Sequence, residues 1–286
     1  MKIKLFSDST CDLSQELIRE YDIQIIPLHV IMDDFSYDDA VNLRPEQIYE
    51  WSDRTRQTPK TSAPSVGEIE KIMRPYLDDY DQFVLFSIAS GMSSSNQSMR
   101  IAVSDLGIED RSLVIDSQNL STGIGLLIIK AAEMIMAGCD ITEIEKTVNR
   151  LIPEVRSSFV VDTLTYLYRG GRCSGLASLA GAALKLHPLI NVIDGKMVPG
   201  KKYRGNMNRI FRTYADDLKS QLADADKSRV FITHSGSDPD TIEAVRRKLQ
   251  DEYDFKEILV TQAGCVISSH CGPNTLGVLF IANGGK

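Results

Sequence analysis

Most of the short motifs that identify an enzyme are missing from this 286-residue sequence. It has no GxxxxGK[ST] phosphate loop, no GxGxxG after its first expected strand, and no HExxH or other metal-ligand spacing. The segment around Ser93 reads Gly-Met-Ser-Ser-Ser, which is not the GxSxG nucleophile elbow of α/β hydrolases. The sequence therefore predicts no metal, no cofactor and no catalytic residue, and gives no sign of a nucleotide site of these kinds.

The sequence also has few cysteines, and its basic residues are fewer than its acidic ones. The five cysteines include no CxxC pair, which argues against a disulfide framework and a zinc site. A net charge of −7 lacks the basic footprint of a nucleic-acid-binding protein. The most apolar stretch, residues 124–136, is too short and too charged to span a bilayer, and the N-terminus lacks signal-peptide architecture. We expect a cytoplasmic protein with no nucleic-acid partner and no stable membrane insertion, although transient membrane contact stays open.

The patterns that are present predict an α/β protein of two domains. The composition, 43% apolar and 25% charged, supports a substantial core. Over residues 1–153, strand and helix patterns alternate, which predicts an N-terminal α/β/α domain with a parallel sheet. Over residues 154–286, short strands follow one another, which predicts a C-terminal α+β domain with a mixed or antiparallel sheet.

Local signals place most of the expected elements. Pro45 and Ser65 each mark a helix start, Asp140 and Glu143 form a capping box, and Asp194-Gly195 predicts a hairpin turn. The expected strands are residues 3–7, 23–30, 83–88, 113–115, 157–161, 189–193, 196–198, 201–203, 230–233, 258–261, 266–269 and 276–281. Further helices are expected at residues 120–137, 141–152, 176–184, 207–222 and 239–250.

Three hydroxyl-rich loops follow strands of the predicted parallel sheet, at residues 7–10, 87–95 and 116–123. Ligands of such sheets bind beyond the carboxyl ends of the strands, and nearby helix N-termini favour an anion. Helix capping is the alternative role for any one loop. A fourth segment, residues 58–65, contains two prolines that stiffen the chain around Thr61 and Ser62. Together these segments predict a site for a small acidic group.

The second half of the chain adds three candidate features. Gly170 and Gly171 allow close backbone approach, and Arg172 supplies a guanidinium for a carboxylate or phosphate. His270 is expected where a strand ends in a Gly-Pro turn. Lys202 and Arg204 belong to a basic run that is either a solvated face or a docking surface for a partner.

Taken in order, these segments resemble the DegV family of bacterial fatty-acid-binding proteins. The order is specific to the family, although each segment alone is weak. The matching segments are Asp8-Ser9-Thr10-Cys11-Asp12-Leu13, Thr61-Ser62-Ala63-Pro64-Ser65, Ser90-Gly91-Met92-Ser93 with Gln97-Ser98, Asp116-Ser117, Gly170-Gly171-Arg172, Pro188-Leu189-Ile190 with Asp194-Gly195, and His270 with Gly272-Pro273. They cover essentially the whole chain.

The resemblance implies a non-catalytic lipid-binding protein with a long-chain fatty acid held between and within two α/β domains. It implies that Thr61 and Ser93 hydrogen-bond the carboxylate, with Ser62 beside them and Arg172 and His270 approaching from the second domain. Members of the family serve as the acyl-binding subunit of fatty-acid kinase. They present the carboxylate to a separate ATP-binding subunit, which makes the acyl phosphate for phospholipid synthesis.

The sequence departs from the family pattern at several positions near the implied site. Ala63 stands where Gln is frequent, Ser94-Ser95-Asn96 replaces Gly-Thr-Tyr, His187 replaces a Lys, and Asn274 replaces a Gly. The last three departures bear on the ligand rather than on the fold.

Two other functions remain open at this stage. Ser93 could be the nucleophile of a serine hydrolase with His270 as base and Asp8 as third member, which requires Ser93 and His270 within hydrogen-bond reach. Alternatively, the hydroxyl loops could bind a small phosphorylated metabolite. For a fatty acid, small side chains in the expected helix over residues 176–184 could leave room for the tail, and tight helix packing is the other explanation for them.

Overall fold

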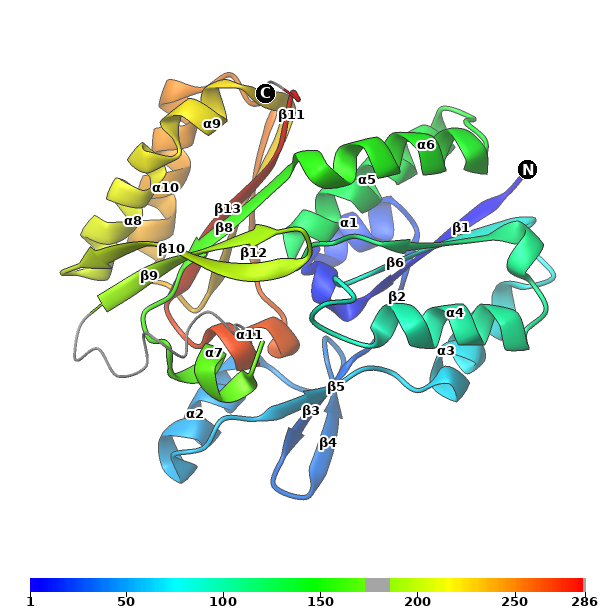
Figure 1. The fold of residues 1–286 in the computed structure, drawn as a ribbon, viewed down its shortest axis with the longest axis horizontal. Helices are drawn as coiled ribbons and strands as arrows, with labels where there is room; N and C mark the ends of the chain where they lie inside the picture. Colours follow the sequence, from blue (N-terminus) through cyan, green and yellow to red (C-terminus); the bar gives the residue numbers. More distant parts are fainter. Residues whose placement is uncertain (173–185, 285–286) are drawn as a thin grey trace.

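The computed structural model describes residues 1–172 and 186–284, and its two larger sheets lie side by side (Figure 1). A four-stranded parallel sheet comes from the first part of the chain, and a six-stranded mixed sheet comes from the last part. A third sheet of three strands lies at the bottom of Figure 1. The α/β fold class expected from the sequence is therefore confirmed, whereas the expected helix over residues 176–184 lies outside the described residues.

The parallel sheet has the strand order β2–β1–β6–β7. Its strands are β1 (Ile3–Asp8), β2 (Ile23–Ile26), β6 (Gln82–Ser87) and β7 (Ser112–Asp116). Helices pack on both faces, as buried strands of this kind require. They are α1 (Gln15–Glu20), α5 (Thr122–Met136) and α6 (Ile141–Leu151) on one side, and α3 (Val66–Met73) and α4 (Ser95–Asp105) on the other.

Helix starts in this part of the chain follow their local signals. The Ser65 hydroxyl accepts a hydrogen bond from the Glu68 amide at the start of α3, and the Glu68 carboxylate accepts one from the Ser65 amide. Asp140 and Glu143 form the same reciprocal pair at α6. Such caps satisfy amides that have no partner within the helix, so a few adjacent residues suffice to predict them.

The prediction of one continuous strand over residues 23–30 is wrong. The chain leaves the parallel sheet after Ile26 and enters another sheet at His29, on either side of Pro27 and Leu28. Proline lacks the amide that a ladder needs, and the next amide, that of Leu28, donates to the Ser9 hydroxyl at 3.0 Å. The chain then enters the antiparallel sheet β4–β3–β5. Its strands are β3 (His29–Met32), β4 (Phe35–Asp38) and β5 (Lys60–Ser62), with α2 (Pro45–Thr55) between β4 and β5 in the chain.

The six-stranded sheet has the order β10–β9–β8–β13–β11–β12, and all its neighbours are antiparallel except β11 and β12. The strands are β8 (Val155–Val160), β9 (Leu186–Ile193), β10 (Lys196–Arg204), β11 (Ala225–Ser235), β12 (Glu257–Gln262) and β13 (Thr275–Ala282). Its helices are α7 (Thr165–Gly170), α8 (Met207–Asp217), α9 (Lys219–Ala223), α10 (Pro239–Glu252) and α11 (Cys265–Cys271).

Three expectations for this half need correction. The strands expected at residues 196–198 and 201–203 are one strand, β10, whose pairing shifts between Pro199 and Lys202. The helix expected over residues 207–222 is divided into α8 and α9 at Leu218. The strand expected at residues 266–269 is helix α11, so His270 lies in the last turn of a helix and not at the end of a strand.

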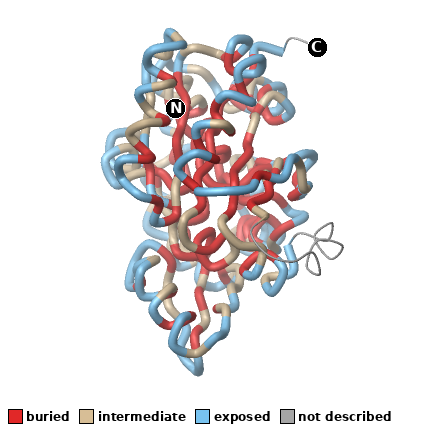
Figure 2. The backbone as a smooth tube through the Cα atoms, turned by 90° about the vertical axis from the view of Figure 1, so that its left-hand side faces the viewer, coloured by how far each residue is buried: buried red, intermediate tan, exposed pale blue. Residues whose placement is uncertain are grey.

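One hydrophobic core joins the two larger sheets. Helix α5 contacts β1 and β6 of the parallel sheet and also β8, β11 and β13 of the mixed sheet. Its fully buried residues Leu127 and Ile128 share a cluster with Phe159 and Leu279 of the mixed sheet. Figure 2 shows the buried backbone concentrated in the interior, with far more exposed chain in the lower lobe that holds β3 and β4. The parts of the chain that meet around α5 are thus held by continuous packing.

Candidate functional site

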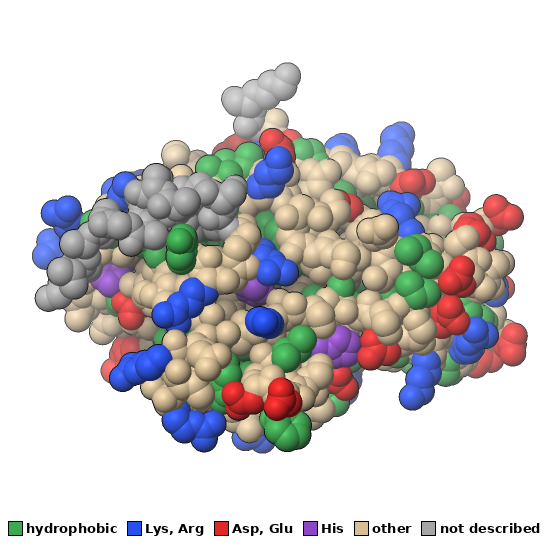
Figure 3. All heavy atoms as spheres, turned by 60° about the horizontal axis from the view of Figure 1, so that its bottom comes forward, with side chains coloured by type: hydrophobic (Ala, Val, Ile, Leu, Met, Phe, Trp, Pro, Cys, Tyr) green, Lys and Arg blue, Asp and Glu red, His purple; other side chains and the backbone are tan. Residues whose placement is uncertain are grey.

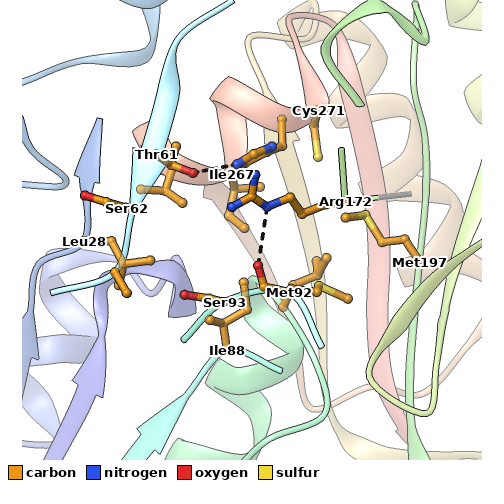
Figure 4. A pocket seen from close by; sticks show the side chains of 14 residues that line it. Leu28, Thr61, Ser62, Ile88, Met92, Ser93, Arg172, Met197, Ile267 and Cys271 are labelled. Carbon is orange, nitrogen blue, oxygen red and sulfur yellow. Dashed lines mark hydrogen bonds between the residues drawn. The ribbon is translucent and has the colours of Figure 1, made fainter. Parts of the chain in front are cut away.

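A pocket lies where the loops after β6 and β7 face β5, α11 and the β9–β10 hairpin (Figure 4). The empty space between its walls amounts to about 480 Å³, a volume that includes open solvent. Most of its lining is apolar. The lining residues are Leu28, Thr61, Ser62, Ala63, Ile88, Met92, Ser93, Leu120, Arg172, Met197, Val266, Ile267, His270 and Cys271.

All five residues expected at the ligand site line this pocket. Thr61 and Ser62 come from β5, Ser93 from the loop before α4, Arg172 from the segment after α7, and His270 from α11. The fold therefore brings together the polar side chains of four segments that are far apart in the sequence. Figure 4 shows the Arg172 side chain near Thr61, with Ser62 and Ser93 toward the left of the pocket.

A hydrogen bond joins Thr61 to His270 across the pocket wall. His270 Nε2 lies 2.8 Å from Thr61 Oγ1, whereas the buried Nδ1 atom has no hydrogen-bond partner. Burial, together with the nearby positive charge of Arg172, lowers the pKa of His270 to about 4. The imidazole is therefore neutral at physiological pH. When its proton is on Nε2, the ring donates to Thr61 and leaves the Thr61 hydroxyl hydrogen free for a ligand.

Arg172 reaches two main-chain carbonyls at the mouth of the pocket. Its Nη1 donates to the Gly170 carbonyl at 2.7 Å, and its Nε lies 3.5 Å from the Met92 carbonyl oxygen. Arg172 therefore connects the end of α7 to the loop that carries Ser93. Because a guanidinium has five N–H groups, these contacts leave donors that can reach a carboxylate.

The two glycines before Arg172 have different structural roles. A Cβ atom on Gly170 would lie 2.3 Å from His270 Nδ1, so only glycine lets the chain pass this close to the imidazole. Gly171 has φ +67° and ends α7 in the left-handed conformation that glycine adopts without strain. The sequence predicted that the two glycines would bring the backbone close to a ligand. At Gly170 the backbone instead lies close to the His270 side chain.

The hydroxyl-rich loops contribute less to the pocket than the sequence suggested. In the first loop, Asp8 is buried and accepts hydrogen bonds from the Thr10 hydroxyl, the Ser95 hydroxyl and the Ile88 amide, at 2.5, 2.8 and 2.8 Å. The third loop contributes only Leu120 to the lining. The first loop supports the second loop, residues 87–95, through Asp8, and Ser93 is the loop hydroxyl that lines the pocket.

The geometry does not favour a serine hydrolase. His270 is bonded to Thr61, and the Ser93 oxygen accepts a hydrogen bond from the Ser95 amide at 3.2 Å. Asp8 is bonded to Thr10, Ser95 and Ile88, so it is not placed to orient the imidazole. Ser93, His270 and Asp8 therefore do not form the hydrogen-bonded chain that a Ser-His-Asp triad requires.

The sequence departures near the site fit their surroundings. Ser95 donates to Asp8, and the Asn96 side chain donates to the Ser87 hydroxyl at 2.9 Å. Asn274 has φ +55°, a left-handed conformation that asparagine tolerates better than most residues. Ser95, Asn96 and Asn274 therefore maintain the framework around the pocket without lining it, whereas Ala63 is one of the lining residues.

Lys202 and Arg204 lie away from the pocket lining, on the edge strand β10. Their neighbours Lys201 and Tyr203 both bond the Asp217 carboxylate, at 2.6 and 2.7 Å. Lys202 and Arg204 are exposed. In Figure 3, basic side chains are spread over the whole face shown, and acidic ones are most frequent toward its right end.

Residues 1–172 and 186–284 contain neither a metal-binding cluster nor a membrane-spanning helix. Within these ranges, no cluster of three or more His, Cys, Asp or Glu side chains is arranged to hold a metal ion. None of the helices in the same ranges combines the length and apolar character needed to cross a membrane.

The fold and the pocket define an α/β protein with a parallel and a mixed sheet and an apolar pocket that carries hydroxyl, imidazole and guanidinium groups. The chain belongs to the DegV family: the family model described as "Uncharacterised protein, DegV family" matches residues 2–283. A DegV domain-containing protein of Caldanaerobacter subterraneus subsp. tengcongensis is 33% identical over 279 residues, 98% of each chain.

Solved structures of the family superpose closely on this fold. A DegV family protein from Thermus thermophilus, described by its fatty-acid binding, has a TM-score of 0.91 at 28% identity and covers 99% of this chain and 100% of its own. A stearic-acid-binding protein from Eubacterium ventriosum has a TM-score of 0.84 at 26% identity, with 98% of both chains covered. The structural neighbours of this chain thus include proteins that bind fatty acids.

Proposed function

We propose that this protein binds a long-chain fatty acid, with the carboxylate at Thr61, Ser62 and Ser93 and the tail among the apolar lining residues. Arg172 and His270 complete the polar end of the pocket. The observation that carries the proposal is the convergence of these five side chains on one otherwise apolar pocket. The fatty-acid binding of structural neighbours such as the Thermus thermophilus protein supports the same ligand class.

The balance of polar and apolar groups suits a fatty acid. Burial of each methylene is worth about 0.8 kcal/mol, so a long tail supplies roughly 10 kcal/mol before the cost of association. Each hydrogen bond to the carboxylate adds about 1.5–3 kcal/mol. The tail therefore provides most of the affinity, and the hydroxyls fix the position of the head group. A small phosphorylated metabolite would use the polar end alone and would leave the apolar lining unoccupied.

We further propose that the protein is the non-catalytic acyl-binding subunit of a fatty-acid kinase in the bacterial cytoplasm. A separate ATP-binding subunit would transfer the γ-phosphoryl group of ATP to a carboxylate oxygen, releasing ADP and leaving an acyl phosphate for phospholipid synthesis. The absence of phosphate-loop motifs from the sequence is compatible with this division of labour. The exposed Lys202 and Arg204 are the proposed docking residues for that partner.

Mass spectrometry of the denatured, purified protein tests the ligand directly. We expect a co-purified fatty acid, or stoichiometric uptake of added oleate after delipidation. The double variant Thr61→Ala/Ser93→Ala should bind oleate more weakly because both head-group hydroxyls are gone. A protein that carries no lipid and takes up no oleate would overturn the proposal, and a tightly held phosphorylated metabolite would favour the alternative.

A further inference from the structure

The helix that carries His270 begins without a local cap. Helix α11 starts after Gly264, which has no side chain to accept a hydrogen bond from the first free amides. Two aspartates from the other end of the chain accept them instead. Asp12 Oδ1 accepts from the Gly264 amide at 2.8 Å, and Asp39 Oδ1 accepts from the Cys265 amide at 2.7 Å. The sequence separations are 252 and 226 residues, so α11 is capped by long-range contacts.

Both carboxylates are buried and held by further hydrogen bonds. Asp39 Oδ2 accepts from the Ser9 hydroxyl at 2.8 Å, and Asp12 Oδ2 accepts from the Ser121 hydroxyl at 2.5 Å. A Cβ atom on Gly264 would lie 3.0 Å from Asp39 Oδ1 and 3.1 Å from Asp12 Oδ1. The absence of a side chain at position 264 is thus what allows both carboxylates to reach the start of the helix.

The same aspartates connect to two walls of the pocket. The Ser9 hydroxyl accepts a hydrogen bond from the Leu28 amide and donates one to the Asp39 carboxylate. The Asp39 amide in turn donates to the Leu28 carbonyl at 2.8 Å. Leu28 forms one wall. Helix α11 forms another wall through Val266, Ile267, His270 and Cys271. Asp39 therefore fixes α11 relative to Leu28, and with it the position of the imidazole that bonds Thr61.

We infer that Asp39, together with Asp12, is a positioning residue of the proposed fatty-acid site, which holds α11 so that His270 meets Thr61. The expected effect of Asp39 on fatty-acid binding rests on the proposed function. Its expected effect on the position of His270 does not depend on any ligand. Neither aspartate lines the pocket. The negative charge matters because a carboxylate at a helix N-terminus is stabilised by the helix dipole as well as by the amides.

The groups around Asp39 determine how it titrates. Burial raises the pKa of Asp39 to about 6, partly offset by the hydrogen bonds from Ser9, Cys265 and Val266. Burial also raises the pKa of Asp8 and that of Asp12, and the Asp39 and Asp8 charges raise the pKa of Asp12 further. On α11, burial and nearby carboxylates, including Glu46 of α2, raise the pKa of the Cys265 thiol, which stays protonated.

The isosteric variant Asp39→Asn removes the charge and one titrating group while keeping a carbonyl oxygen for the Cys265 amide. Its matched control is Asp238→Asn, because Asp238 also caps a helix, accepting from the Thr241 amide and hydroxyl at 3.0 and 2.7 Å at the start of α10. The first measurement is the ¹⁵N spectrum of the His270 imidazole in ligand-free protein. We expect Asp39→Asn to shift the His270 resonances and Asp238→Asn to leave them unchanged.

The second measurement is oleate affinity between pH 5 and pH 7.5. In the wild-type protein we expect affinity to fall as the pH drops through about 6, because protonated Asp39 holds α11 less firmly. In Asp39→Asn the contribution of Asp39 to this fall should be absent, so the step should be smaller than in the wild-type protein, and affinity at pH 7.5 should be lower by about threefold to tenfold. Titration of the oleate carboxyl affects both proteins equally, so it cancels in the comparison.

Unchanged His270 resonances, or an unchanged pH step, in Asp39→Asn would overturn the positioning role. Failure of the wild-type protein itself to bind oleate would instead overturn the proposed function. The His270 spectrum would still decide the positioning role in that case.

Discussion

Thr61 and His270 are 209 residues apart in the sequence and share a hydrogen bond of 2.8 Å. The geometry gives the imidazole a supporting role, since its Nε2–H can orient the Thr61 oxygen while the Thr61 hydroxyl hydrogen turns to a carboxylate. Arg172 is the only permanently charged side chain that lines the pocket among the described residues. The polar end therefore combines one positive charge with neutral donors.

Removal of the Thr61 hydroxyl tests this arrangement. Thr61→Val keeps the shape of the side chain, removes a donor to the ligand and leaves His270 Nε2 without its partner. We expect oleate affinity to fall by about 10- to 100-fold in isothermal titration. Thr58→Val is the matched control, because Thr58 is partly buried in the same segment but does not line the pocket. Equal affinities for the two variants would contradict the role of Thr61.

The depressed pKa of His270 also predicts a pH dependence of stability. Between about pH 6.5 and about pH 4 the unfolded chain binds a proton at His270 and the folded protein does not, so stability falls as the pH is lowered through this window. The effect is at most about 3 kcal/mol. Asp39 acts in the opposite direction, because its raised pKa makes the folded state bind the proton more tightly, so its contribution falls as the pH rises from about 4 to about 6.

The two effects can be separated by urea denaturation at pH 5 and pH 7.5. His270→Gln should lose less stability than the wild-type protein on going to pH 5, whereas Asp39→Asn should lose more. Parallel profiles for wild-type and His270→Gln would show that the folded protein binds a proton at His270 as readily as the unfolded chain does, which would contradict the lowered pKa.

At the scale of elements, the tip of the β9–β10 hairpin packs on the loop over residues 87–95. A Cβ atom on Gly91 would lie 3.0 Å from the Gly195 carbonyl oxygen, and one on Gly195 would lie 3.4 Å from Ala89. Met197, two residues beyond the turn, lines the pocket. The hairpin thus forms a wall of the pocket whose position depends on a glycine in the facing loop.

Gly91→Ala tests the contact between hairpin and loop. The added methyl group should displace the hairpin, lowering stability by about 1–3 kcal/mol and weakening oleate binding. Gly67→Ala is the control, because a Cβ on Gly67, within α3, meets no atom within 4 Å. Alanine in a helix should there be neutral or stabilising by up to about 1 kcal/mol. If Gly91→Ala were as stable as Gly67→Ala in thermal unfolding, the contact would not constrain the hairpin.

The elements that were predicted correctly are those with local signals. The caps at Ser65 and Asp140 and the turn at Asp194-Gly195, where φ is +48° and +70°, are specified by neighbouring residues. Helix α11 was missed because Val266 and Ile267 favour a strand and its capping aspartates lie more than two hundred residues away. Nothing local marks Asp39 as part of the site.

The polar residues of the candidate site were easier to predict from the sequence than its apolar walls and the buried residues that hold it in place. The ordered family segments led to all five polar lining residues, since motifs of this kind mark the side chains themselves. The apolar walls, such as Leu28, Met92 and Met197, carry no such mark, because an apolar residue in a pocket and one in the core look alike in sequence. Asp8, the possible third member of a hydrolase triad, is a buried support instead, a difference that only its three-dimensional partners reveal.

For the whole molecule, the proposed docking residues lie apart from the pocket, so binding of lipid and of partner should be separable. Charge reversal in Lys202→Glu/Arg204→Glu should weaken the interaction with the kinase subunit, measured by pull-down from a bacterial lysate with quantification of ATP-dependent acyl-phosphate formation. Oleate affinity should stay unchanged. Lys71→Glu/Arg74→Glu, in the last turn and at the C-cap of α3, is the control for the change in net charge. Equal loss in both double variants would assign the effect to overall charge.

The capping of α11 by Asp12 and Asp39 has a consequence for how the chain acquires its pocket. Residues 12 and 39 leave the ribosome long before residue 264, and the wall that holds His270 has no cap of its own until they meet. Closure of loops this long is slow compared with the formation of local helices. Lipid uptake should therefore return with the slowest phase of refolding, after most of the secondary structure has formed. A nascent chain that still lacks α11 would be unable to retain a fatty acid.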